Sequence, residues 1–425
     1  MTLLLLSVAA VAFLIALGLA WQGWLGGVLG IVALFLVVGA FVAFTLGRRR
    51  LAGTARGRVD TIAKVVFTVG GFVALLRHPI AVEDGVQPLH NALVAHLGEV
   101  ELVPFLVFGA LAMGIKLVGV VASAGAWYLL LRGQRIRVPF FQTVLTGFLI
   151  GRFIGTFLPS TLGLDGYTLW EAGRVTGEWH RVVTAKAVEK VAGATALFVG
   201  ILVATPVLVG VFSQAFGPWG WVASVVVGGG ALSVTIVGLG VLVFPGLLRA
   251  VVRLFGRVVP KVARHHVDRL TDAVVAYKGQ LGLLGAAFGL KVVNHVNTAI
   301  VYWFTALAIG VTGAAFLPIV AGSLVQIVGT LVAPTIGGEG AREAIQALLL
   351  TDYYDSNPAK AVLAAALGFI AAEAATLWGG AFLWTRTPSW RPTVCEVDGV
   401  AVDRGDGQAF DVATARAQLM GATEE

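Results

Sequence analysis

The sequence has little charge and almost no cysteine. Only 12% of its 425 residues are charged, whereas soluble domains carry about 25%. Hydrophobic residues make up 58% of the chain, and the mean hydropathy is +0.89. This composition excludes a soluble globular protein and indicates a polytopic membrane protein. The single cysteine, Cys395, excludes an internal disulfide.

Several motifs of catalysis and nucleotide binding are also missing. The sequence contains no Walker loop, no G-x-S-x-G, no H-E-x-x-H and no paired-cysteine motif. No extramembrane stretch is long enough for an ATPase or a soluble catalytic domain, so any transport would run downhill or on an ion gradient. We expect no cofactor, and no metal, because a lone His295 is too little for a metal site. The formal charge of +7 does not indicate nucleic-acid binding, because the basic residues cluster in short loops beside apolar runs.

Apolar runs recur along the chain, most of them long enough to cross a hydrocarbon core about 30 Å thick. They are Thr2–Ala20, Trp24–Leu46, the shorter Thr61–Leu76, Leu102–Leu131, Val183–Val211, Trp219–Pro245, Leu281–Ile309 and Ala359–Phe382. Basic residues place the loop after Leu46 and the loop Ala250–Gln280 in the cytoplasm. The apolar spacing within Ala250–Gln280 predicts an interfacial helix. We expect both termini to be cytoplasmic and the membrane to be the plasma membrane.

A glycine-rich stretch occurs twice and organises the rest of the chain. GTFLPSTLGLDG, Gly155–Gly166, aligns without a gap on GTLVAPTIGGEG, Gly329–Gly340. Broken apolar segments at matching positions of two halves are the best sequence indication of a transporter binding site. Chance similarity between two glycine-rich turns is the alternative. The expected turn residues are Pro159, Gly163, Gly166, Pro334, Gly337, Gly338 and Gly340.

Counting spans from the cytoplasmic loops makes each copy enter and leave on one side of the membrane. The first dips in from the cytoplasm and the second from outside. We therefore expect an all-α polytopic membrane protein with about eight transmembrane helices and two re-entrant helical hairpins in an inverted repeat. One miscounted span would turn a hairpin into a crossing and make the repeat parallel.

Ionisable and polar residues in or beside the apolar runs are the candidate binding residues. We expect substrate contacts from Arg152, Asp165, Glu171, Arg174, Lys186, Glu189, Lys190, Lys291, Asn294, His295, Glu339, Arg342 and Glu343. The arginines would bind phosphate. Asp165 and Glu339 would either cap the helix after each turn or orient the hairpin tip.

For the lysines the sequence leaves alternatives open. Lys186 and Glu189 have the spacing of a helical ion pair, but near a membrane boundary they could also be snorkelling side chains. Lys291, Asn294, His295 and Thr298 form a polar stripe on one helix face. The stripe would line a cavity or hydrogen-bond to a neighbouring helix. Lys116 and Glu373 also lie well inside apolar runs, where charged groups are costly and are functional candidates.

Two segments resemble a known family. RFIGTFLPSTLGLDGYTLWEAGR, with the region of Lys186, Glu189 and Lys190, and GTLVAPTIGGEGAREA resemble the two signatures of the lysylphosphatidylglycerol synthase transmembrane region, also called the flippase-like domain. Two positions depart from the pattern: Leu164 stands where a glycine is usual, and Lys190 where an arginine is common. The resemblance implies movement of lipids with modified or lipid-linked head groups between leaflets. No synthase domain is present, so aminoacyl transfer is not expected.

The resemblance covers residues 60–385, with repeat halves at about 102–247 and 281–382. Residues 1–50 would add two transmembrane helices, and 386–425 would be a polar, disordered cytoplasmic tail. The expected function is a lipid translocator for anionic phospholipids or prenyl-phosphate-linked head groups. The alternatives are a membrane-embedded lipid-modifying enzyme with Glu171, Glu189 or Glu343 as acid or base, a non-catalytic partner of a synthase or glycosyltransferase, and a small-solute carrier.

Overall fold

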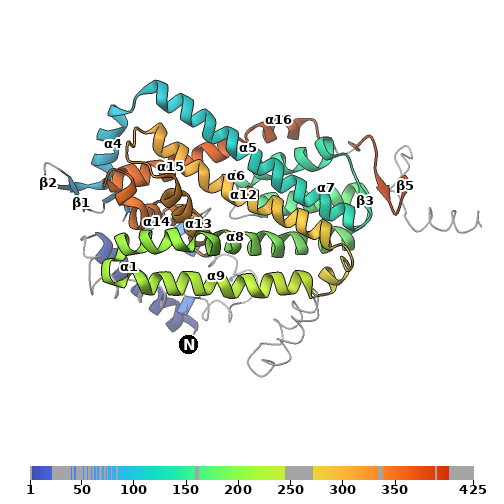
Figure 1. Ribbon diagram of the computed structural model, residues 1–425, viewed down its shortest axis with the longest axis horizontal. Helices are drawn as coiled ribbons and strands as arrows, with labels where there is room; N and C mark the ends of the chain where they lie inside the picture. The colour runs from blue at the N-terminus through green and yellow to red at the C-terminus, as the bar shows by residue number, and fades with distance from the viewer. Residues whose placement is uncertain are drawn as a thin grey trace, which may run out of the picture. The chain divides into compact units, whose positions relative to one another are not determined.

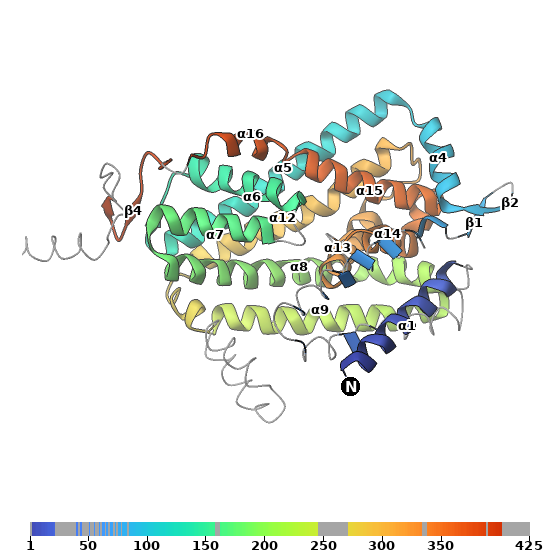
Figure 2. The same ribbon diagram turned by 180° about the vertical axis from the view of Figure 1, so that it is seen from behind.

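A computed structural model describes the chain except residue 1, residues 22–39, scattered positions between 41 and 78, and residues 83–84, 158–161, 245–270, 334–337, 388–389 and 402–425. The described chain is mostly helical, as the composition predicts (Figures 1 and 2). It divides into two compact units. Unit 1 comprises Met1–Ala112, Pro206–Trp221 and Ala299–Ile370, and unit 2 comprises Met113–Thr205, Val222–Thr298 and Ala371–Glu425. Each unit contains one copy of the glycine-rich stretch.

Helices make up most of the elements, and the few strands are short. In chain order the elements are α1 (Thr2–Trp21), β1 (Pro79–Val82), β2 (Gly85–Pro88), α4 (Leu89–Glu99), α5 (Leu102–Gly133), β3 (Ile136–Arg137), the π-helix η1 (Phe140–Leu145), α6 (Thr146–Phe157), α7 (Leu162–Thr176), α8 (Trp179–Phe216), the 3₁₀-helix η2 (Gly217–Trp219), α9 (Gly220–Val243), α12 (Leu281–Ala308), α13 (Phe316–Val332), α14 (Ala341–Leu350), the 3₁₀-helix η3 (Thr351–Tyr353), α15 (Pro358–Ala374), α16 (Trp378–Trp384), β4 (Glu396–Val397) and β5 (Val400–Ala401).

Three described stretches are long and apolar enough to cross a membrane: Leu102–Gly133, Trp179–Val243 and Pro358–Trp384. The second contains both α8 and α9. Shorter apolar helices occupy Phe140–Thr156 and Phe316–Val332, the segments that lead into the two glycine-rich stretches. The mostly helical fold is therefore confirmed, and these apolar helices are consistent with a membrane protein, whereas the count of about eight spans and the re-entrant course of the hairpins stay predictions.

In unit 2 the first glycine-rich stretch joins α6 and α7, which pack against each other. Gly163 lies against Gly155, so closely that a Cβ at Gly163 would come within 2.4 Å of the Gly155 Cα. Gly163 and Gly166 belong to the first turns of α7, not to the turn itself, which corrects the role predicted for them. Gly163 instead lets two helix backbones approach. Pro159 lies outside the described residues.

In unit 1 the second stretch precedes α14, which packs on α13. Gly338 and Gly340 have φ values of 77° and 78°, a region that only glycine adopts readily. The Glu343 carboxylate accepts the backbone N–H of Gly340 at 2.8 Å and so closes the first turn of α14. Pro334 and Gly337 lie outside the described residues.

The core of unit 2 lies between α5, η1, α6, α7, α8 and the start of α12. Trp127, Phe148 and Tyr277 are its largest side chains, and the Tyr277 hydroxyl donates to the Leu130 carbonyl at 2.7 Å. The predicted span Ala359–Phe382 divides into α15 and α16, because α16 turns to pack along α6. Gly379 permits this contact, since a Cβ there would meet the Leu149 carbonyl oxygen.

The segment after α16 departs from the disordered tail predicted from residue 386. β4 pairs antiparallel with β3 and with β5, and Cys395 is buried in the core of unit 2. The Asp398 carboxylate accepts both terminal nitrogens of Arg181, at 3.0 and 2.9 Å. The remainder of the tail lies outside the described residues, as do most of the predicted second span and most of the predicted interfacial helix.

Candidate functional site

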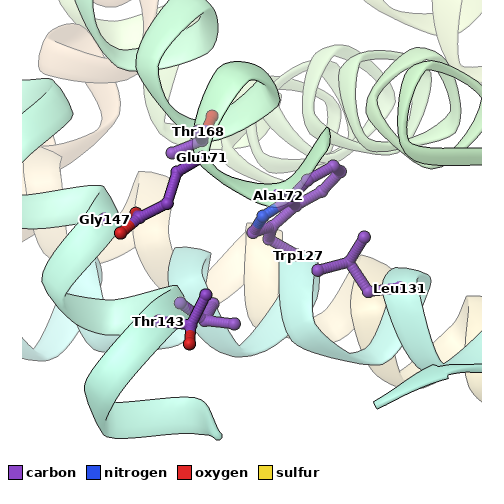
Figure 3. Close-up of a pocket in the computed structure, with 8 residues that line it drawn as sticks. Trp127, Leu131, Thr143, Gly147, Thr168, Glu171 and Ala172 are labelled. Atoms are coloured by element: carbon purple, nitrogen blue, oxygen red, sulfur yellow. The ribbon is translucent and has the colours of Figure 1, made fainter. Parts of the chain in front are cut away.

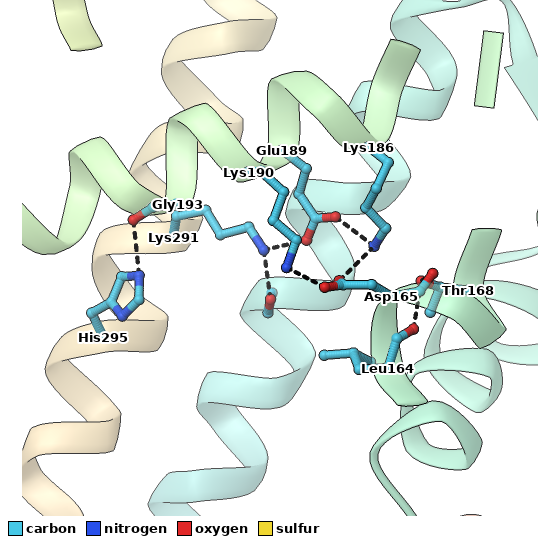
Figure 4. A network of polar contacts seen from close by, with 10 residues as sticks. Leu164, Asp165, Thr168, Lys186, Glu189, Lys190, Gly193, Lys291 and His295 are labelled. Atoms are coloured by element: carbon cyan, nitrogen blue, oxygen red, sulfur yellow. Dashed lines mark hydrogen bonds and ion pairs between the residues drawn. The ribbon is translucent and has the colours of Figure 1, made fainter. Parts of the chain in front are cut away.

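A buried ion cluster forms where α8 meets α12 in unit 2 (Figure 4). Glu189 accepts a hydrogen bond from Lys186 at 2.6 Å, one turn away on α8. Its other oxygen pairs with Lys291 of α12, which also donates to Ser123 of α5 at 2.7 Å. The Glu189 side chain is 5% exposed. The i, i+3 ion pair, one of the two alternatives that the sequence left open, is present, and Glu189 joins two helices as well.

Asp165 extends this cluster to the first hairpin. It lies in the first turn of α7, and its carboxylate is 2.5 Å from the Lys190 ammonium and 3.7 Å from that of Lys186. The Lys190 side chain is 52% exposed and the Asp165 side chain 18% exposed, so this pair forms the open side of the cluster. Asp165 thus binds α8 side chains, as Figure 4 shows.

The polar stripe on α12 contacts both α8 and α5. His295 donates from Nε2 to the Gly193 carbonyl of α8 at 3.0 Å. Asn294 packs against Gly119 of α5, where a Cβ would lie 3.4 Å from the Asn294 Oδ1. Lys116 of α5 donates to Thr298 at 3.0 Å. The contacts of His295 and Thr298 are the helix–helix hydrogen bonding that the sequence left open as one alternative, and Asn294 adds close packing.

Basic groups outnumber acidic ones in the region that α5, α7, α8 and α12 share. The charged side chains there are Lys116, Lys186, Lys190, Lys291, Asp165 and Glu189. The Lys186 ammonium lies 4.3 Å from the centre of the Trp127 ring and 5.4 Å from that of Phe148, which adds cation–π stabilisation. The cluster can therefore accept an anion.

The predicted phosphate-binding arginines have protein partners instead. Arg152 of α6 pairs with Glu373 of α15 at 3.1 Å, and Thr156 donates to the same carboxylate at 2.6 Å. The Arg174 guanidinium lies over the Trp170 ring at 4.7 Å. These contacts fix α6 and α7, and they leave the lysines as the better candidates for anion binding in unit 2.

The predicted site residues of unit 1 form a separate group. Arg342 donates to Glu343 at 3.2 Å and lies 4.2 Å from the centre of the Phe369 ring. Both charged side chains are buried. Within the described residues the Glu339 carboxylate has no hydrogen-bond or ion-pair partner. Glu343 therefore fastens the start of α14, and Arg342 fastens it to α15.

Glu171 is held by a residue that sequence reasoning missed. Its carboxylate pairs with the Arg386 guanidinium at 3.0 Å, and both side chains are buried. The other carboxylate oxygen lies against Gly147, beside a small cavity that Thr143 and Trp127 also line (Figure 3). Arg386 lies four residues after the end of the last apolar run, so in the sequence its charge indicates only a membrane boundary. Its stacking on Trp390, 3.4 Å from the ring centre, depends on tertiary structure.

Ser123, which accepts a hydrogen bond from Lys291 of the ion cluster, is a second residue that sequence reasoning missed. It is a hydroxyl within the apolar run of α5, and its one signal is that polarity. In the part of the chain that the structure describes, no group of three or more His, Cys, Asp or Glu side chains could hold a metal ion.

A family model described as "Lysylphosphatidylglycerol synthase TM region" matches residues 91–379, which include the cluster and both glycine-rich stretches. The chain matches no curated protein and no solved structure.

Proposed function

Because this chain belongs to the lysylphosphatidylglycerol synthase transmembrane-region family, we propose that it moves phospholipids between the two leaflets of the membrane. The lipids are those whose head group carries a negative phosphate: anionic phospholipids or prenyl-phosphate-linked head groups. The head group passes through the polar interior of the protein while the acyl or prenyl chains stay in the bilayer. In this proposal the two hairpins are re-entrant and related by an inverted repeat.

The excess of lysine in the cluster is the observation that carries the proposal. Moving a charge from water into a protein interior costs several kcal/mol unless a partner compensates it. Glu189 compensates part of the charge of Lys186 and Lys291, and Asp165 part of that of Lys190. The remaining positive charge favours an anion, and a phosphate ester oxygen offers both the charge and strong hydrogen-bond acceptors.

The exposure of Lys190 supports a path for the head group. Half of the Lys190 side chain is exposed, whereas Lys186 and Lys291 are buried. An entering anion would therefore contact Lys190 before it contacts the other two lysines. The start of α7 lies beside it, and the N–H groups of a helix start favour negative charge. We therefore assign Lys190 as the first contact of the phosphate, with Lys186 behind it.

Leaflet exchange in proteoliposomes tests the proposal. Purified protein is reconstituted with labelled phosphatidylglycerol, and a membrane-impermeant quencher reports the label that reaches the outer leaflet. We expect exchange well above protein-free vesicles, and a loss of about tenfold or more in Lys190→Gln. Lys360→Gln is the matched control, because Lys360 pairs with Asp355 in unit 1. Exchange at the protein-free rate, or equal exchange by both variants, would contradict the proposal.

A further inference from the structure

We propose that Asp165 is a built-in counter-ion, which the phosphate of the lipid displaces from Lys190 and Lys186. The inference rests on the proposed function and specifies how the same site binds and releases its substrate. In the structure Asp165 occupies the position that an anionic ligand would take, between the exposed Lys190 and the buried Lys186 (Figure 4).

Of the two carboxylates in the cluster, only Asp165 is placed for exchange. Glu189 makes hydrogen bonds to two lysines, and its side chain is almost fully buried. Asp165 has one close ammonium at 2.5 Å and a second at 3.7 Å, and the side chains of Asp165 and Lys190 are 18% and 52% exposed. Partly exposed ion pairs are weak, typically about 0.2–1 kcal/mol, so an incoming anion can replace this one at little cost.

Charge balance defines the class of ligand. The lysines at 186, 190 and 291 face the carboxylates at 165 and 189. A phosphodiester carries one negative charge, so exchanging it for the Asp165 carboxylate leaves the balance unchanged. A zwitterionic head group would bring an ammonium among lysines, where like charges repel. The site therefore favours head groups with net negative charge.

Displacement of Asp165 would also free the start of α7, the second helix of the first hairpin. α7 is fastened near its middle by the buried pair of Glu171 with Arg386. At its first turn the ion pairs of Asp165 connect it to α8. When phosphate replaces Asp165, this connection ends while the buried one holds. Head-group binding is thereby coupled to release of the start of α7 from α8.

The return of Asp165 to the lysines would then help to expel the phosphate. Asp165→Asn removes the competing charge and should strengthen lipid binding by up to about fivefold, which corresponds to a partly exposed ion pair. The same substitution should slow leaflet exchange, because release loses its competitor. A residue that merely binds the lipid, or merely supports the fold, would weaken binding when replaced.

The experiment measures binding of soluble short-chain phosphatidylglycerol to the purified full-length protein, together with leaflet exchange. Asp165→Asn should bind more tightly and exchange more slowly than wild type, and Asp165→Glu should restore both values. Glu373→Gln is the matched control, since Glu373 is 19% exposed, pairs with an arginine of the same hairpin and lies outside the cluster. It should bind the lipid as wild type does. A short-chain prenyl phosphate is the second probe. The probe that binds more tightly to Asp165→Asn than to wild type identifies the class of lipid whose phosphate enters the site.

Unchanged or weaker binding by a folded Asp165→Asn variant would overturn the counter-ion role and leave the proposed function standing. If wild type binds short-chain phosphatidylethanolamine as tightly as short-chain phosphatidylglycerol, the proposed exchange of phosphate for the Asp165 carboxylate is wrong. Failure of wild type to bind any phosphate-bearing probe and to exchange lipid would overturn the proposed function, and the counter-ion role with it. Thermal unfolding of each variant confirms that the compared proteins are folded.

Discussion

Among single substitutions in the ion cluster, we expect Glu189→Gln to cause the largest loss of stability. The carboxylate lies between Lys186 and Lys291, with its side chain 5% exposed. The amide keeps the shape and one acceptor but removes the charge, so Lys291 loses its carboxylate partner and Lys186 keeps only Asp165, 3.7 Å away. Breaking a buried ion pair by removing one partner typically costs about 3–5 kcal/mol. Because glutamine still accepts a hydrogen bond, we expect a loss near the lower end, about 3 kcal/mol.

The assay is reversible unfolding of the detergent-solubilised protein in a denaturing detergent, followed by circular dichroism. Glu373→Gln is the comparison, and its partly exposed pair should cost no more than about 1 kcal/mol. Adding Lys291→Met to Glu189→Gln should recover part of the lost stability, because one uncompensated charge disappears. If Glu189→Gln costs less than Glu373→Gln, or if the second substitution lowers stability further, the charge argument is wrong.

Three further predictions concern the first hairpin and the segment after α16. Gly163→Ala should destabilise the protein, because the added methyl meets the backbone of Gly155, whereas Gly166→Ala meets nothing within 4 Å and should be tolerated; thermal unfolding separates the two. Burial, with a smaller contribution from the charge of a neighbouring carboxylate, raises the pKa of the Cys395 thiol to about 11. Maleimide labelling of this single cysteine should therefore be much slower at pH 7.5 than for a free thiol and should rise with pH. Arg386→Ala leaves the buried Glu171 without its cation, should cost about 3 kcal/mol, and should speed the labelling of Cys395.

Controls for these predictions come from the same chain. Arg135→Ala removes an exposed pair with Asp398 at 3.9 Å, so it should affect neither unfolding nor labelling measurably. Labelling of the intact protein at the rate of a free thiol would show that the segment after α16 does not cover Cys395 in solution. Equal unfolding temperatures for Gly163→Ala and Gly166→Ala would contradict the close approach of α6 and α7.

The helices could be predicted from the sequence because apolar run length decides them. The helices α5, α8, α9 and α12 begin and end within a few residues of their apolar runs. The break between α15 and α16 could not be predicted. It depends on the fit of Gly379 against α6, and a run of apolar residues carries no information about such a contact.

The site was predictable only where its contacts are local. Lys186 and Glu189 are one helical turn apart, so their pairing follows from spacing. The partners of Asp165 and Glu171 come from α8 and from the segment after α16, which no spacing rule connects to α7. From the sequence, phosphate binding was expected of the arginines, and the lysines were expected as further substrate contacts. The folded chain instead pairs Arg152 with Glu373 and gathers the lysines.

The charge at position 190 tests the central claim most directly. Leaflet exchange of labelled phosphatidylglycerol is measured in proteoliposomes that contain equal amounts of wild type, Lys190→Arg, Lys190→Gln and Lys190→Glu. If Lys190 is the first contact of the phosphate, exchange should stay near the wild-type rate in Lys190→Arg, fall in Lys190→Gln and fall further in Lys190→Glu. Exchange that is the same in all four folded proteins would contradict a path through the lysine cluster.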